Sequence, residues 1–163
     1  LISMKHTLIY ETTLPCNVEV LFDFHADTNN LPLITPHDTK VDIIKIETPL
    51  KKGNQAILRI KKGFVSFVWE LTFEDVLYPH LIIDVAKRSP FKMFKHEHHF
   101  IAIDERHSIL RDKITFSLPF WPLSLLAVPF IKHDMHKMFA YRHAQIKAYL
   151  SHHTSPPTDS KAP

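Results

Sequence analysis

The chain has 163 residues, 45% of them hydrophobic, which suffices for one globular domain with a sizeable core. Its formal net charge is only +3 with neutral histidines, and no dense lysine or arginine stripe indicates nucleic-acid binding. The single cysteine, Cys16, excludes an intrachain disulfide, and the two glycines are too few for a three-glycine dinucleotide motif and lack the Lys-Ser or Lys-Thr of a phosphate loop. We therefore expect a domain of a reducing, cytoplasmic compartment that uses none of the common nucleotide-binding folds.

The first part of the chain predicts one strand followed by two short helices. Residues 5–14 are rich in Thr, Ile and Tyr, as strands are, and Pro15 ends the run. Asn17 is a suitable N-cap for a helix. The buried face of that helix is formed by Val18, Leu21, Phe22 and His25. A second cap at residues 27–30 opens another short helix, which Thr35 and Pro36 close.

Six further strands are predicted next, separated by turns that include both glycines. They cover residues 41–47, 55–61, 64–77, 81–87, 93–103 and 108–118. In the longest of them the residues of one face are Phe67, Trp69, Leu71 and Phe73. Strands covered on one face by helices make an α+β domain, with about seven strands in one curved antiparallel sheet.

The last long element is an amphipathic helix over residues 129–150. Its apolar face comprises Ile131, Met135, Met138, Phe139, Ile146, Tyr149 and Leu150. Arg142 interrupts this stripe, and we expect the sheet to grip the helix with a cavity between them. Residues 119–129 form an apolar, proline-broken run that we expect to be packed, a lid or a peripheral membrane contact being alternatives. Residues 151–163 are expected to be a disordered tail.

The order of these elements, together with several short motifs, resembles the helix-grip fold of the START and Bet v 1-like superfamily, also called SRPBCC. The motifs are residues 14–22 at the entry to the first helix, 25–36 in the second, Ser89-Pro90-Phe91 with His96-x-His98-x-Phe100, Asp112 with Leu118-Pro119, and residues 138–143. The pair of motifs around residues 89–100 is similar to the bacterial polyketide cyclase/dehydrase-like branch. The turn at residues 104–107 departs from the glycine-rich turn that related proteins usually have.

This resemblance implies a single ligand-binding domain over residues 1–150, with a hydrophobic cavity between the sheet and the long helix. Superfamily members bind lipids, sterols, polyketides and other apolar small molecules, and some catalyse cyclisation or dehydration in the cavity. We accordingly expect an apolar small-molecule ligand and no nucleic-acid partner. The runner-up interpretation is a cyclase/dehydrase-type enzyme.

A cluster of polar residues is expected inside this cavity. His96, His98 and Phe100 share one face of their strand, and Asp112 and Phe116 share the apolar face of the next. If the turn between these strands gives an even register, His98 lies opposite Asp112, and a carboxylate beside an imidazole raises the pKa of the histidine. The predicted ligand-contacting residues are His96, His98, Phe100, Asp112, Arg142, Trp69, Phe67, Phe116, Met135, Met138 and Phe139.

Three interpretations of the cluster stay open. Buried polar groups usually satisfy one another, so Asp112 with Arg142 would form a structural link between strand and helix. The same groups could recognise a ligand, or His98 and Asp112 could act as a catalytic acid–base pair. His-x-His with an acid is also a ligand set for iron or zinc, but with 13 histidines such patterns arise by chance, so we expect no metal and no cofactor.

Overall fold

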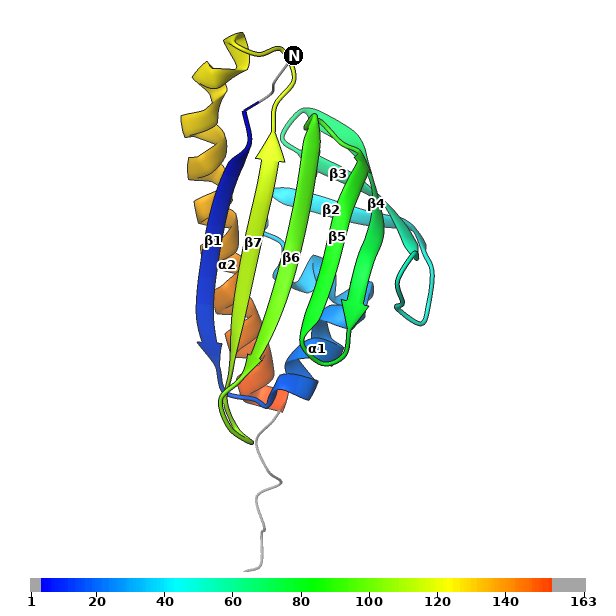
Figure 1. Cartoon of the computed structure of the whole chain (residues 1–163), viewed down its shortest axis with the longest axis vertical. Coiled ribbons are helices and arrows are strands. Elements are labelled where there is room, and N and C mark those ends of the chain that lie inside the picture. The colour runs from blue at the N-terminus through cyan, green and yellow to red at the C-terminus, as the bar shows by residue number, and fades with distance from the viewer. Residues whose placement is uncertain (1–3, 154–163) are drawn as a thin grey trace, which may run out of the picture.

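The computed structural model describes residues 4–153, which form a seven-stranded antiparallel sheet, two α-helices and two short 3-10 helices (Figure 1). The strands are β1 (His6–Leu14), β2 (Thr39–Ile46), β3 (Gln55–Lys62), β4 (Val65–Leu77), β5 (Leu81–Arg88), β6 (Met93–Ala102) and β7 (Ser108–Ser117). The helices are α1 (Val18–Ala26), η1 (Thr28–Ile34), η2 (Leu123–Ala127) and α2 (Val128–His153). The sheet order β1-β7-β6-β5-β4-β3-β2 confirms the predicted helix-grip architecture.

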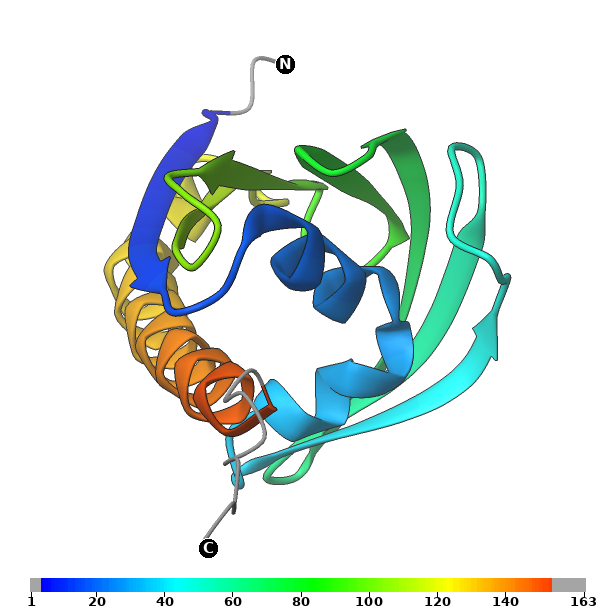
Figure 2. The same ribbon diagram turned by 90° about the horizontal axis from the view of Figure 1, so that it is seen from below.

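The sheet is strongly curved, and the helices close its concave side. Register shifts between β2 and β3 and twice between β4 and β5 mark bulges, which bend the strands and increase their twist. The tight turns on either side of β3 use Gly53 and Gly63 at φ of 88° and 59°, a region that favours glycine. Helix α2 runs along the open side of the curve, while α1 and η1 lie across one end (Figure 2).

The two short helices follow the caps that the sequence predicts. The Asn17 side chain accepts a hydrogen bond from the Val20 backbone N–H at 2.9 Å, which fixes the start of α1. Asp27 caps the next segment in the same way, but that segment is the 3-10 helix η1 rather than an α-helix. It is only seven residues long, and Pro32 inside it cannot donate a backbone hydrogen bond.

Helix α2 buries a single stripe against the sheet. The buried residues are Met135, Phe139, His143, Ile146 and Leu150. Phe139 is 1% exposed and stacks on Tyr10 of β1 with ring centres 4.7 Å apart. The helix continues to His153, three residues past the predicted end, and the rest of the predicted tail lies outside the described residues.

The apolar run before α2 is not packed, contrary to expectation. Phe120, Leu123 and Leu126 are 84%, 71% and 74% exposed, because the segment folds as a short 3-10 helix that leaves the body of the domain. None of the helices in residues 4–153 is long and apolar enough to cross a bilayer.

Candidate functional site

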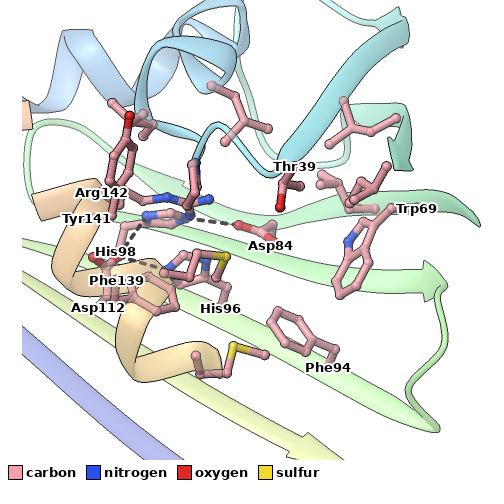
Figure 3. Close-up of a pocket in the computed structure, with 18 of the residues that line it drawn as sticks. Thr39, Trp69, Asp84, Phe94, His96, His98, Asp112, Phe139, Tyr141 and Arg142 are labelled. Atoms are coloured by element: carbon pink, nitrogen blue, oxygen red, sulfur yellow. Dashed lines mark hydrogen bonds and ion pairs between the residues drawn. The ribbon is translucent and has the colours of Figure 1, made fainter. Parts of the chain in front are cut away.

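A cavity of about 590 Å³ is lined by the inner face of the sheet and by residues of helices α2, α1 and η1. Its wall is mostly apolar and includes Leu58, Ile60, Phe67, Trp69, Leu71 and Met135. Trp69 and Phe94 pack edge to face at 4.8 Å near one end, and a group of histidines and aspartates lies at the other (Figure 3). The cavity is therefore amphipathic, with one polar end.

The opening of the cavity is marked by charged residues that line it and are exposed. Lys62 of β3 lies 3.8 Å from Asp38 and 3.9 Å from Asp134 of α2, and all three side chains are more than half exposed. Such exposed ion pairs contribute little to stability. They form a polar rim of the cavity between β3 and α2.

Strand alternation and register bring the polar groups of the interior together. His96 and His98 are two residues apart on β6, so both face the cavity, and His98 is paired with Asp112 of β7. This is the register that the sequence predicts. Asp84 of β5 is paired with His96 on the other side. Three neighbouring strands thus contribute to one cluster (Figure 3).

Asp112 is the centre of this cluster and is only 1% exposed. Its Oδ1 lies 2.8 Å from Nε2 of His96 and its Oδ2 lies 2.6 Å from Nε2 of His143 in α2. An ionised carboxylate only accepts hydrogen bonds, so both imidazoles donate to it. Burial alone would raise the pKa of Asp112, but the contacts with His143, His96 and His98 hold that pKa well below its ordinary value.

His98 lies between two carboxylates. Its Nε2 is 3.0 Å from Oδ2 of Asp84, and its Nδ1 is 3.2 Å from Oδ1 of Asp112 at an angle that does not make a hydrogen bond. Burial by itself lowers the pKa of His98, but the contacts with Asp112 and Asp84 outweigh it and raise that pKa to about 9. His98 is therefore protonated at neutral pH. Its ring stacks on His96 at 3.7 Å, and burial together with that positive charge lowers the pKa of His96.

His25 of α1 adds a neutral imidazole to the cavity wall. Its Nδ1 lies 2.9 Å from the backbone oxygen of Leu21 and must donate, because a carbonyl cannot. Burial, followed by the nearby charge of His98, lowers the pKa of His25 to about 3. The neutral ring then carries its lone pair on Nε2, so this histidine can accept a hydrogen bond.

Arg142 brings a positive charge into the same space without an ion-pair partner among the described residues. Its Nε is buried and makes no hydrogen bond, and its guanidinium lies 5.3 Å from the centre of the Phe139 ring. Burial lowers the pKa of Arg142, and the charges of Asp112 and Asp84 oppose that shift without touching the guanidinium. The expected link from Arg142 to Asp112 is absent here, because His143 occupies that side of the carboxylate.

Nine of the eleven predicted ligand-contacting residues line the cavity: Phe67, Trp69, His96, His98, Asp112, Met135, Met138, Phe139 and Arg142. Phe100 and Phe116 do not. Phe100 faces inward as predicted, but α1 covers it with Phe22 and His25. Phe116 is fully buried and packs edge to face against Phe91 at 5.5 Å. Both belong to the core because neighbouring aromatic rings fill the space in front of them.

Two cluster residues, Asp84 and His143, were missed as members of the site. His143 is four residues after Phe139 and three before Ile146, so helical spacing places it on the buried stripe. Asp84 alternates with Ile82 along β5, which puts it on the inward face. Both signals are present in the sequence. An arginine is more unusual than a histidine on an apolar stripe, so the sequence favours Arg142 as the helix partner of Asp112.

Cys16, His133 and His136 lie outside this cluster. Cys16 is buried at the start of α1, where its Sγ lies 3.8 Å from Oγ of Ser108, and burial raises the pKa of its thiol. It is a core residue rather than a nucleophile. His133 and His136, one turn apart on α2, are both exposed at the surface of the helix.

No protein-family model and no curated protein sequence matches the chain, but its structure is similar to several solved ones. The Zhui aromatase/cyclase from Streptomyces sp. R1128 has a TM-score of 0.76 at 11% identity, over 95% of this chain and 99% of that one. Norcoclaurine synthase from Thalictrum flavum has a TM-score of 0.72 at 12% identity, with the same coverage. Protein TTHA0849 from Thermus thermophilus has a TM-score of 0.70 at 10% identity, over 92% of this chain and all of that one. These likenesses show that the chain shares the helix-grip fold of these proteins.

Proposed function

We propose that the protein binds an apolar small molecule carrying a carboxylate, such as a lipid- or polyketide-like acid, in the cavity between the sheet and α2. The volume of about 590 Å³ lies within the range of roughly 300–1,000 Å³ common for small-molecule sites. The apolar wall would hold the body of the molecule. The carboxylate would meet the polar end of the cavity, where Arg142 lies.

The observation that carries this proposal is the guanidinium of Arg142, whose Nε is buried and unpaired while the side chain as a whole is partly buried. A buried charge is costly unless it is paired, and no carboxylate among the described residues forms an ion pair with it. Arginine presents its donors in a planar fork that matches a carboxylate in a bidentate arrangement. A ligand carboxylate would supply the missing partner.

The proposal is tested by comparing dodecanoate with dodecanol, which has the same chain and no charge. Wild-type protein is expected to bind dodecanoate at one site, at least tenfold more tightly than dodecanol, measured by calorimetry. Arg142→Gln should remove this preference and leave the weak binding of dodecanol unchanged. The matched control is Arg111→Gln, because Arg111 lies on β7 outside the cavity and pairs with Glu11 at 2.7 Å. Equal affinities for the two probes in wild-type protein would contradict the proposal.

The second candidate is a cyclase/dehydrase-type enzyme that uses the same cavity. It is favoured by the presence of a protonated and a neutral histidine side by side, His98 and His25, with ring centres 5.7 Å apart. The first would act as a general acid, and the second would accept a hydrogen bond from the reacting group. The sequence predicts His98 and Asp112 as the acid–base pair. In this candidate mechanism Asp112 instead fixes the orientation of the histidines and exchanges no proton.

The mass of the ligand after incubation distinguishes binding from catalysis. A carrier returns its ligand with unchanged mass after incubation and extraction, whereas a dehydratase returns a product lighter by one water. If a product forms, His98→Gln and His25→Gln should each slow its formation while dodecanoate still binds. Product formation that neither substitution slows would contradict the assignment of these two histidines.

A further inference from the structure

Asp84, His96 and His98 place three metal-ligating groups together at the polar end of the cavity. Each offers one ligand atom, and these atoms lie within 4.8 Å of one another. Asp84 and His96 are direct partners across β5 and β6, and His98 follows two residues later on the same face. The backbone of two paired strands, rather than mobile loops, therefore holds the group.

We propose that Asp84, His96 and His98 form a binding site for a divalent first-row transition metal ion. The ion would take the place of the proton on Nε2 of His98, which is released to the solvent on binding. Two imidazoles and one carboxylate on one side of an ion are a well-known donor set that leaves positions open for a ligand or for water. His98 Nε2 and Asp84 Oδ2 lie 3.0 Å apart. Two ligand atoms at about 2.1 Å from one ion, at right angles, are separated by about that distance.

Asp112 orients the histidines as the carboxylate behind a metal ligand does. It accepts a hydrogen bond from Nε2 of His96, which leaves Nδ1 of that ring with the lone pair. It also lies 3.2 Å from Nδ1 of His98, which leaves Nε2 on the side of Asp84. Metal-ligating histidines usually direct their second ring nitrogen at a carboxylate or a carbonyl, and here one carboxylate faces both.

The sequence predicts no metal, and the acid that it places beside His96 and His98 is Asp112. The structure provides a separate acid, Asp84, and gives Asp112 the supporting position. The inference does not depend on the proposed ligand. An ion here would add positive charge beside Arg142 and two aspartates, and so would favour an anionic ligand in the same cavity.

The test uses Co²⁺ alone as the probe, added to tag-free wild-type protein that has first been treated with a chelator. One equivalent should bind and give visible absorption bands of protein-bound cobalt. Asp84→Asn and His96→Gln should each weaken binding at least 100-fold, and Asp112→Asn about 10- to 100-fold. The matched control is His99→Gln, because His99 is the next residue on β6, faces away and pairs with Glu97 at 3.4 Å. That variant should bind Co²⁺ as wild type does.

Circular dichroism checks that each variant is folded. A second experiment, NMR on wild-type protein, locates the bound ion without any substitution. Paramagnetic broadening of NMR signals by Co²⁺ should centre on residues 84, 96 and 98. Broadening centred on His133 and His136, or on other exposed histidines, would overturn the proposal. It would also be overturned by folded Asp84→Asn and His96→Gln variants that bind as wild type does, or by wild-type protein that binds no Co²⁺.

Discussion

At the scale of single residues, the interior depends on Asp112. A carboxylate that is 1% exposed would be very unfavourable by itself, and it is tolerated because His96, His98 and His143 surround it. These partners come from β6 and α2, while Asp112 belongs to β7. The residue thus links the helix to the sheet and also shapes the polar end of the cavity.

Asp112→Asn is expected to destabilise the protein by about 3–5 kcal/mol, because it removes one partner of a buried ionic cluster and sets amide donors against imidazole donors. Urea unfolding measures this loss. The control is Glu11→Gln, which removes an exposed pair with Arg111 and should cost about 0–1 kcal/mol. Equal losses in the two variants would show that Asp112 is not held as described.

The pH dependence of stability reports on His98. Its pKa in the folded protein is about 9, above the ordinary 6.5, because Asp112 and Asp84 favour the charged ring. The contribution of His98 to the free energy of unfolding is therefore complete below pH 6.5 and is lost as the pH rises through 9. In chelator-treated protein the free energy of unfolding should fall by up to about 3 kcal/mol across this window.

His98→Gln should remove most of that alkaline slope. Three of the other groups that face His98 do not titrate in this window, because the pKa of Asp112 is held well below its ordinary value and the pKa values of His25 and His96 are lowered. The lowered pKa values of these two histidines give a separate loss of stability as the pH falls below 6.5. An alkaline slope that is the same in wild type and His98→Gln would contradict the assignment.

At the scale of elements, α2 performs two tasks with adjacent residues. His143 points at Asp112 and Arg142 lies along the cavity, because successive residues of a helix are turned by about 100°. Phe139, one turn earlier, contacts both: the centre of its ring is 6.1 Å from that of His143 and 5.3 Å from the Arg142 guanidinium. The helix is thus the support of the site as well as its cover.

Phe139→Ala should cost about 3–5 kcal/mol of unfolding free energy, because it removes a fully buried ring and leaves a space between α2 and β1. Chemical unfolding measures it. His133→Ala on the exposed face of the same helix should change stability by no more than about 0.5 kcal/mol. If the two variants are equally stable, α2 does not pack on the sheet through this stripe.

At the scale of the whole molecule, the cavity exists because a bulged sheet curves away from α2. Ile60 of β3 lines the space far along the sheet from β1, whereas its neighbour Arg59 is exposed on the other face. A large side chain at position 60 would therefore enter the cavity, and one at position 59 would not.

Ile60→Trp is expected to lower the affinity for dodecanoate at least tenfold by filling the apolar part of the cavity. Arg59→Trp should bind as wild type does. Calorimetry measures the affinities, and circular dichroism shows that both variants are folded. Unchanged binding by folded Ile60→Trp would place the ligand outside this cavity.

Much of this architecture could be predicted from the sequence because it follows from short-range rules. The alternation in β4 placed Phe67 and Trp69 on the cavity wall, and the register of β6 with β7 set His98 opposite Asp112. Packing across elements could not be predicted in the same way. Helix α1 covers Phe100, and His143 rather than Arg142 contacts Asp112. Both facts depend on how the helices pack on the sheet, which the spacing of residues along one element does not determine.

The apolar run at residues 119–129, before α2, is another feature that the sequence did not predict correctly. Its composition predicts burial, yet Phe120 and Leu126 are exposed, because no other segment within residues 4–153 covers them. Hydrophobicity gives the tendency of a segment to be buried, and the topology decides whether a partner is there.

The most direct test of the proposed binding function is native mass spectrometry of gently purified protein, followed by organic extraction of what is bound. We predict one adduct per chain that extracts as a carboxylic acid, or a single dodecanoate adduct after addition of that probe. Ile60→Trp should lose the adduct, and Arg142→Gln should lose its preference for the acid. A neutral adduct that persists in both variants, or no adduct in wild-type protein even with dodecanoate, would contradict the account.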